Sequence, residues 1–140
     1  MLRLASSRPR ERSRMRAVRA LFIRHGAEST AEGRSLRLLR DWLSPTQWAQ
    51  FAANGYFEVV GGDTGKQYRI YAGAETNVCE IDEKGRPKLG LCFRPIGELP
   101  IGDVMLSQKI ALEGHESGAL AIARRFVPSG FMFRRSRPLR

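Results

Sequence analysis

Four short segments rich in aromatic and β-branched residues follow one another between residues 56 and 93 of this chain. They are "YFEVV" (56–60), "QYRIY" (67–71), "NVCEI" (77–81) and "KLGLCF" (88–93). Alternation of apolar and polar residues within each segment is typical of a β-strand. The links "GGDTGK", "AGAET" and "DEKGRP" are too short for the crossover that parallel neighbours need, so the segments connect as hairpins. The sequence therefore predicts a four-stranded antiparallel meander.

Two helices are predicted before these strands. In residues 35–43, "SLRLLRDWL", leucines recur at helical spacing. In residues 44–55, "SPTQWAQFAANG", we expect Ser44 to cap the helix N-terminus and Gln47 to complete a capping box. A proline at the first helical position and a left-handed Gly55 after the last turn complete the signature.

Two further helices are predicted after the strands. Residues 103–114 read as a helix that Asp103 caps. Residues 115–126 read as another helix, with Arg124 and Arg125 in the last turn, where cations stabilise the helix dipole. The expected fold is α+β: two N-terminal helices, a four-stranded antiparallel meander and two C-terminal helices.

The net charge of +10 is distributed unevenly along a chain of 140 residues, a length typical of one domain. Residues 1–40 hold eleven Arg and three Glu, and residues 127–140 hold four Arg and no acid. Residues 41–126 hold nine Lys or Arg and eleven Asp or Glu. We therefore expect a basic, largely disordered lead-in at 1–33, an α+β domain at 34–126 and a basic tail at 127–140.

The first 19 residues are rich in Arg and Ser, which favours disorder and is also typical of a mitochondrial transit peptide. A further alternative is that Met15, rather than Met1, is the true start of the protein. No apolar run approaches the ~20 residues of a membrane span, and we expect a cytoplasmic protein with no membrane partner.

The link "GGDTGK" resembles part of the phosphate-binding motif G-x-x-x-x-G-K-[ST]. Val60 stands where the first glycine is needed, and Gln67 stands where Ser or Thr would hold magnesium. A strand follows, so no helix N-terminus points at a phosphate. We therefore interpret the link as a hairpin turn, in which Gly61, Gly62 and Gly65 provide backbone angles with positive φ.

The segment "ALFIRHGAEST", residues 20–30, resembles the Arg-His-Gly signature of histidine phosphatases and phosphoglycerate mutases. The resemblance implies a nucleophilic His25, with Arg24 holding the phosphate and His115 as a second histidine of the pocket. That family has a doubly wound α/β fold, and the predicted meander leaves no room for its crossover helices. An enzyme that uses His25 is therefore kept as an alternative to a non-enzymatic role.

Two cysteines, Cys79 and Cys92, lie on strands that flank one turn. They can pair, supply half of a metal site, or remain buried and reduced, and the sequence leaves their pairing open. Two thiolates without nearby histidines fall short of a zinc site, so we expect no metal and no cofactor.

An extended resemblance covers residues 34–126. The stretches "LSPTQWAQF", "GYFEVVGGDTGKQYRI", "NVCEID", "GRPKLGLCF" and "LPIGDVMLSQKIALE" resemble a family of small bacterial proteins of unknown function. The resemblance implies the limits of the shared domain and transfers no catalytic residue.

The sequence favours a small non-enzymatic binding or accessory module whose Arg-rich tails contact nucleic acid or another acidic partner. The alternatives are a protein–protein interaction domain without a nucleic-acid role, and the histidine-phosphatase-like enzyme. Exposed basic and aromatic side chains can pair with phosphates and stack on bases. The candidate binding residues are Lys66, Arg69, Tyr71, Arg124, Arg125, Arg134 and Arg135. The oligomeric state stays open.

Overall fold

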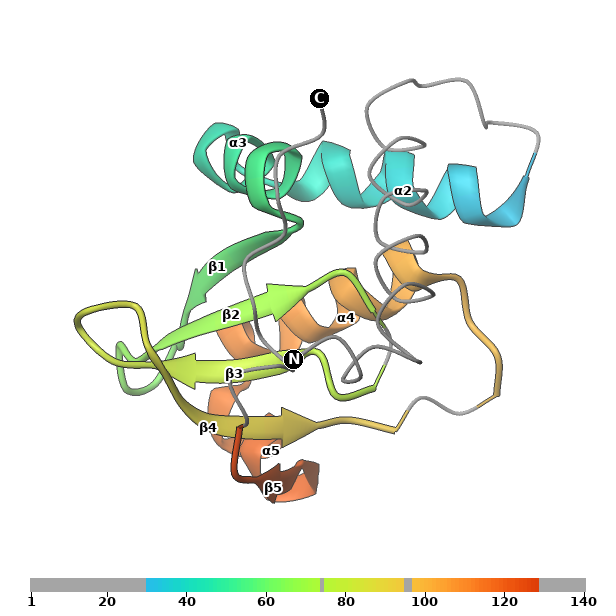
Figure 1. Cartoon of the computed structure of the whole chain (residues 1–140). Helices are drawn as coiled ribbons and strands as arrows, with labels where there is room; N and C mark the ends of the chain where they lie inside the picture. Colours follow the sequence, from blue (N-terminus) through green and yellow to red (C-terminus); the bar gives the residue numbers. More distant parts are fainter. Residues whose placement is uncertain (1–29, 74, 95–96, 129–140) are drawn as a thin grey trace, which may run out of the picture.

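The structure is a computed structural model that describes residues 30–73, 75–94 and 97–128. Its strands form one antiparallel sheet in the order β1-β2-β3-β4-β5 (Figure 1). They are β1 (Tyr56–Val60), β2 (Gln67–Tyr71), β3 (Val78–Ile81), β4 (Pro87–Cys92) and β5 (Arg124–Phe126). The predicted α+β class and antiparallel meander are confirmed, but the sheet has five strands rather than the four expected.

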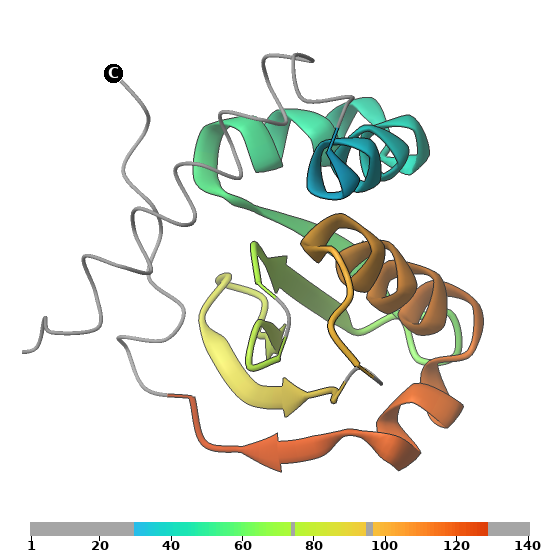
Figure 2. The same cartoon turned by 90° about the vertical axis from the view of Figure 1, so that its right-hand side faces the viewer.

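Helix α4 lies against one face of the sheet, and α2 packs across α4 (Figures 1 and 2). Helix α3 packs beside β1, and the short α5 leads from α4 to β5. The helices are α2 (Ala31–Trp42), α3 (Pro45–Asn54), α4 (Ile101–Gly114) and α5 (Glu116–Ile122). No helix in the described part of the chain is long and apolar enough to cross a membrane.

The predicted caps of α3 are confirmed. Gln47 N–H donates to Ser44 Oγ at 3.1 Å, and Ser44 N–H donates to Gln47 Oε1 at 3.0 Å. Gly55 ends the helix in the left-handed conformation, with φ 76°. Each of these contacts joins residues only a few positions apart, so the local sequence is enough to specify them.

Helix α2 begins at Ala31, four residues before the predicted start. Gly33 N–H donates to Thr30 Oγ1 at 2.9 Å, so Thr30 is the N-cap. The folded body therefore begins at least three residues before the expected boundary at residue 34.

The prediction that Asp103 caps α4 is wrong. The helix begins at Ile101, whose N–H donates to Glu32 Oε1 on α2 at 2.8 Å. The two helices are in close contact here, because a Cβ at Gly102 would overlap the backbone carbonyl group of Ser35. A carboxylate from a neighbouring helix thus takes the place of a cap from the helix itself.

The predicted helix over 115–126 is also wrong in its second half. Helix α5 ends at Ile122, Ala123 is extended, and the next three residues pair with β4. Phe126 lies opposite Gly90, and a Cβ at Gly90 would overlap the Phe126 ring. Phe126 is half-buried, and packing of its ring on a position without a side chain favours the extended form over a helical continuation.

Apolar side chains fill the space between α4, α2 and the sheet. The largest fully buried ones include Tyr68, Phe51, Phe57, Leu36, Leu39, Ile70, Leu91, Met105 and Leu112. Phe51 and Phe57 pack edge to face, with ring centroids 6.2 Å apart. A smaller cluster on the opposite sheet face contains Tyr56, Tyr71, Cys79 and Ile81.

Candidate functional site

The glycine-rich β1–β2 loop, residues 61–66, closes around the side chain of Glu116 at the start of α5. The N–H groups of Asp63 and Thr64 donate to Glu116 Oε1 at 2.9 and 2.8 Å. The Thr64 and Tyr68 hydroxyls donate to Glu116 Oε2 at 2.6 and 2.5 Å. Four donors from one loop and its following strand therefore surround a single carboxylate.

These donors keep Glu116 ionised although it is fully buried. Burial by itself raises the pKa of Glu116, but hydrogen bonds from Thr64, Tyr68 and Asp63 outweigh it and lower the pKa to about 2. On the other side of the contact, burial and the neighbouring Glu116 raise the pKa of Tyr68 above its ordinary value of 10.0. The pair is therefore a carboxylate and a neutral phenol throughout the physiological range.

The loop glycines are required for two different reasons. Only Gly65 has a positive φ, of 75°, so the predicted positive φ at Gly61 and Gly62 is wrong. A Cβ at Gly61 would overlap the Glu116 carboxyl group, and a Cβ at Gly62 would overlap the carbonyl oxygen of Glu113. The first two glycines therefore permit close approach to α4 and α5, and only the third serves the turn. The loop does hold an anion, but that anion belongs to the chain itself.

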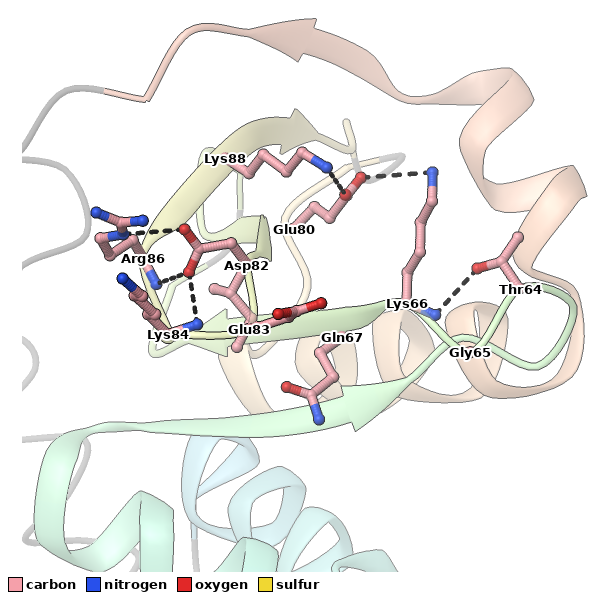
Figure 3. Close-up of a pocket in the computed structure, with 11 residues that line it drawn as sticks. Thr64, Gly65, Lys66, Gln67, Glu80, Asp82, Glu83, Lys84, Arg86 and Lys88 are labelled. Carbon is pink, nitrogen blue, oxygen red and sulfur yellow. Dashed lines mark hydrogen bonds and ion pairs between the residues drawn. The ribbon is translucent and has the colours of Figure 1, made fainter.

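A surface groove of about 680 Å³ lies between this loop and the β3–β4 turn (Figure 3). Its charged lining consists of Lys66, Lys84, Arg86 and Lys88, together with Glu80, Asp82 and Glu83. Lys66 Nζ lies 3.8 Å and Lys88 Nζ 3.5 Å from the carboxylate of Glu80 (Figure 3). The groove thus brings together Lys66 from the β1–β2 loop and Lys88 from β4, with a carboxylate between them that reduces the attraction of the groove for an external anion.

The β3–β4 turn at the other side of the groove is organised by Asp82. Its carboxylate accepts from the N–H groups of Lys84 and Arg86, both at 2.9 Å, and from Arg86 Nε at 3.0 Å. The backbone hydrogen bond from Arg86 lowers the pKa of Asp82 most. Arg86 is therefore already paired within its own turn.

Three predicted binding residues lie in different environments. Lys66 lines the groove, with a half-exposed side chain. Arg69 lies on the opposite sheet face, where its Nη2 is 2.8 Å from Glu58 Oε2 and its guanidinium lies 4.4 Å from the centre of the Tyr56 ring. Tyr71 is only 4% exposed. The expectation that Arg69 is exposed is wrong, and the structure does not bring these three residues together at one surface.

The other predicted binding residues divide between β5 and the C-terminal segment. Arg124 and Arg125 are exposed on β5. They do not end a helix as expected, because the chain is extended at this point. Arg134 and Arg135 lie outside the described residues.

The proposed phosphatase residues Arg24 and His25 also lie outside the described residues. His115 is exposed at the junction of α4 and α5. Cys79 and Cys92 are free thiols, and burial raises the pKa of Cys79 to about 12. Within the described ranges, no group of three or more His, Cys, Asp or Glu residues is placed to hold a metal ion.

Comparison of the chain with protein-family models, curated proteins and solved structures finds no match.

Sequence reasoning missed Glu116, the central residue of the loop contact. Thr64 and Glu116 are 52 positions apart, and no local motif links them. The available signal was the adjacent pair Gly61 and Gly62. Two neighbouring glycines that are not required by a turn indicate close approach of another part of the chain.

Proposed function

We propose that the protein is a small binding module that attaches to an acidic partner through Arg-rich segments at both ends of its folded body. These Arg-rich segments are residues 1–33 and 127–140, which contain eight and four arginines. The observation that carries the proposal is the separation of charge, since residues 30–128 contain twelve basic and twelve acidic residues and the excess of positive charge lies outside them. Clustered arginines attract a polyanion and release its counterions on binding.

The described body supports this assignment because several of its own cations already lie beside carboxylates. Five of them lie within 4.0 Å of a carboxylate: Lys66, Arg69, Arg86, Lys88 and Lys109. Tyr56, Tyr68 and Tyr71 are each at most 8% exposed, so they do not form a surface on which bases stack. The body is therefore a scaffold, and electrostatic attachment falls to the Arg-rich segments.

The test measures binding of the full chain to labelled duplex DNA and to labelled polyglutamate over a range of salt concentrations. A variant carries Gln in place of Arg134, Arg135, Arg137 and Arg140. It should bind DNA more weakly. The slope of log K against the logarithm of the salt concentration should become less negative by about 0.9 for each phosphate that the variant no longer neutralises. The matched control replaces the same four residues with Lys, which keeps the charge and should keep the slope.

Unchanged binding by the Gln variant at low salt, together with unchanged binding when the arginines of residues 1–33 are replaced in the same way, would contradict the proposal. The probe that remains bound at the higher salt concentrations identifies the partner class. Retention of DNA favours nucleic acid, and retention of polyglutamate favours an acidic protein.

A protein–protein interaction domain without a nucleic-acid role is the second candidate. It is favoured by Leu38 and Trp42, one turn apart on α2 and 45% and 58% exposed. Large apolar side chains that gather on a surface are common at interfaces. Replacement of both by Ser should abolish any salt-resistant complex that the wild-type protein forms, without changing the salt-sensitive binding of DNA.

A further inference from the structure

The two edges of the sheet differ in how their backbone is covered. At the β1 edge, Glu58 N–H donates to Gln50 Oε1, and the Glu58 carbonyl accepts from Gln47 Nε2, both at 2.9 Å. Both glutamines belong to α3, which packs beside β1. The side chains of a helix thus occupy backbone groups that another strand would otherwise bind.

The β5 edge has a different character. Among the described residues, β5 pairs with β4 alone, so one side of its backbone faces away from the sheet, along the lower rim in Figure 2. Arg124 and Arg125 are exposed, and neither makes an ion pair with another residue of the described ranges. Ile122 and Val127, which flank them, are 79% and 89% exposed.

This edge is held in a fixed extended form. Arg124 lies opposite Cys92 and Arg125 opposite Leu91 on β4. Adjacent strand residues point to opposite faces, so the two guanidinium groups flank the edge on both sides. A strand that is already extended and paired on one side loses little conformational freedom when a second strand joins it.

The positive charges of Arg124 and Arg125 limit which strand can pair with β5. A second copy of this chain, paired β5 to β5, would bring arginines opposite arginines, and like charges across strands are destabilising. Opposite charges across strands stabilise the pair. The edge therefore fits an extended segment with two adjacent carboxylate residues and apolar residues on either side.

We propose that the β5 edge binds an extended acidic segment of a partner protein, which adds to the sheet as a further strand and pairs its carboxylates with Arg124 and Arg125. Apolar residues of the same segment contact Ile122 and Val127. The inference rests on the proposed function, in that it names one acidic partner class and gives it a site on the folded body.

The test uses the full-length protein and a short fluorescent peptide with a central Glu-Glu pair flanked by Val and Thr. Two further peptides of the same sequence carry backbone N-methyl groups at alternate positions, one set along each edge of the peptide. Both keep the charge, but each loses the hydrogen-bond donors of one edge only. Strand addition requires that one N-methylated peptide binds like the parent and the other binds roughly tenfold more weakly or worse.

Variants of the protein locate the site. Reversal of both charges in R124E/R125E should weaken peptide binding by about tenfold or more. The matched control K84E/R86E changes the net charge equally on the exposed β3–β4 turn and should bind within about twofold of wild type. The N-methylated peptides leave the protein unaltered, so the test remains decisive even if R124E/R125E fails to fold.

Three results would overturn the inference: equal binding of both N-methylated peptides, equal loss of binding in the two charge-reversal variants, or absence of peptide binding. An oligothymidylate that binds through Arg124 and Arg125 and displaces the peptide would also overturn it, by assigning the edge to nucleic acid. The proposed function is tested separately by the replacements in the Arg-rich segments. Polyanion binding that persists through those segments while the peptide fails would leave the proposed function standing.

Discussion

The Tyr68 hydroxyl donates to Glu116 Oε2 at 2.5 Å, and both side chains are completely buried. This contact joins β2 to the start of α5, and the glycine-rich loop donates hydrogen bonds to the same carboxylate. A buried carboxylate is costly unless its oxygens accept hydrogen bonds, and here the donors come from the loop and Tyr68. Glu116 therefore acts as a fixed internal anion that holds the loop against α5.

Replacement of Glu116 by Gln should destabilise the protein by roughly 2–4 kcal/mol. The amide is similar in shape, but it loses charge-assisted hydrogen bonds and turns an NH₂ group toward donors. Urea unfolding at neutral pH measures the change. The control is Glu83→Gln on an exposed turn, which should stay within about 0.5 kcal/mol of wild type. Equal stability of the two variants would contradict the role assigned to Glu116.

The free energy of unfolding should decrease at acidic pH because Glu116 becomes protonated. The pKa of Glu116 is about 2 in the folded protein and 4.5 as the ordinary value, so its ionised form favours folding. The contribution is present above pH 4.5 and is lost as the pH falls toward 2, amounting to about 3 kcal/mol. Unfolding free energies of wild type and E116Q should therefore converge over this range. A constant difference between them from pH 6 to pH 2 would be inconsistent with an ionised Glu116.

Replacement of each loop glycine by Ala should lower the free energy of unfolding by a different amount. Gly61→Ala and Gly62→Ala introduce overlaps with Glu116 and Glu113 and should each destabilise by roughly 1–3 kcal/mol. Gly65→Ala places a side chain at positive φ in open space and should cost about 1 kcal/mol.

A double-mutant cycle separates the first two glycines. In a Glu116→Ala background the carboxyl group is gone, so Gly61→Ala should lose most of its cost. Gly62→Ala should keep its cost, because it meets the backbone of Glu113. Additive behaviour at Gly61 would show that its close approach to Glu116 is not what excludes a side chain.

Addition of a side chain at Gly90 should detach β5 from β4, because the Phe126 ring occupies this position. In Gly90→Val the branched side chain would occupy the position of the Phe126 ring. Limited trypsin digestion should then cleave after Arg124 or Arg125 faster than in wild type, as judged by mass spectrometry. Pro87→Val on the same strand changes an exposed position, and it should leave this rate unchanged.

Cys79 should be unreactive in the folded protein. Its thiol is buried, and burial raises its pKa to about 12, so little thiolate forms at neutral pH. In Cys92→Ala, labelling by a thiol-specific aromatic disulfide should proceed only as fast as the protein unfolds. A rate that does not change with denaturant well below the unfolding midpoint would contradict this expectation.

The elements that the sequence predicted correctly depend on nearby residues. Ser44, Gln47 and Gly55 make hydrogen bonds within one or two turns, so their residue types are sufficient to locate α3. The first four strands follow from alternation and short links, and their observed pairing confirms them. These features have local causes, and a linear pattern therefore records them.

The elements that the sequence predicted wrongly depend on distant partners. Asp103 is a reasonable cap by residue type, but Glu32 provides the hydrogen bond from 69 positions away. The residues of β5 read as a helix, but pairing with β4 and packing of the half-buried Phe126 ring over Gly90 make them a strand. The local conformational preference of these residues differs little between the predicted and the observed structure, so packing against distant segments decides which one forms.

The α+β class, the hairpins, the α3 caps and the location of excess positive charge can all be read from the amino-acid order. Three features appear only in the folded molecule: the contact of the glycine-rich loop with Glu116, the ion pair of Arg69 with Glu58, and the position of Arg124 and Arg125 on a sheet edge. Hydrogen bonding to a buried charge, close backbone approach and strand pairing each need two segments that meet only when the chain folds.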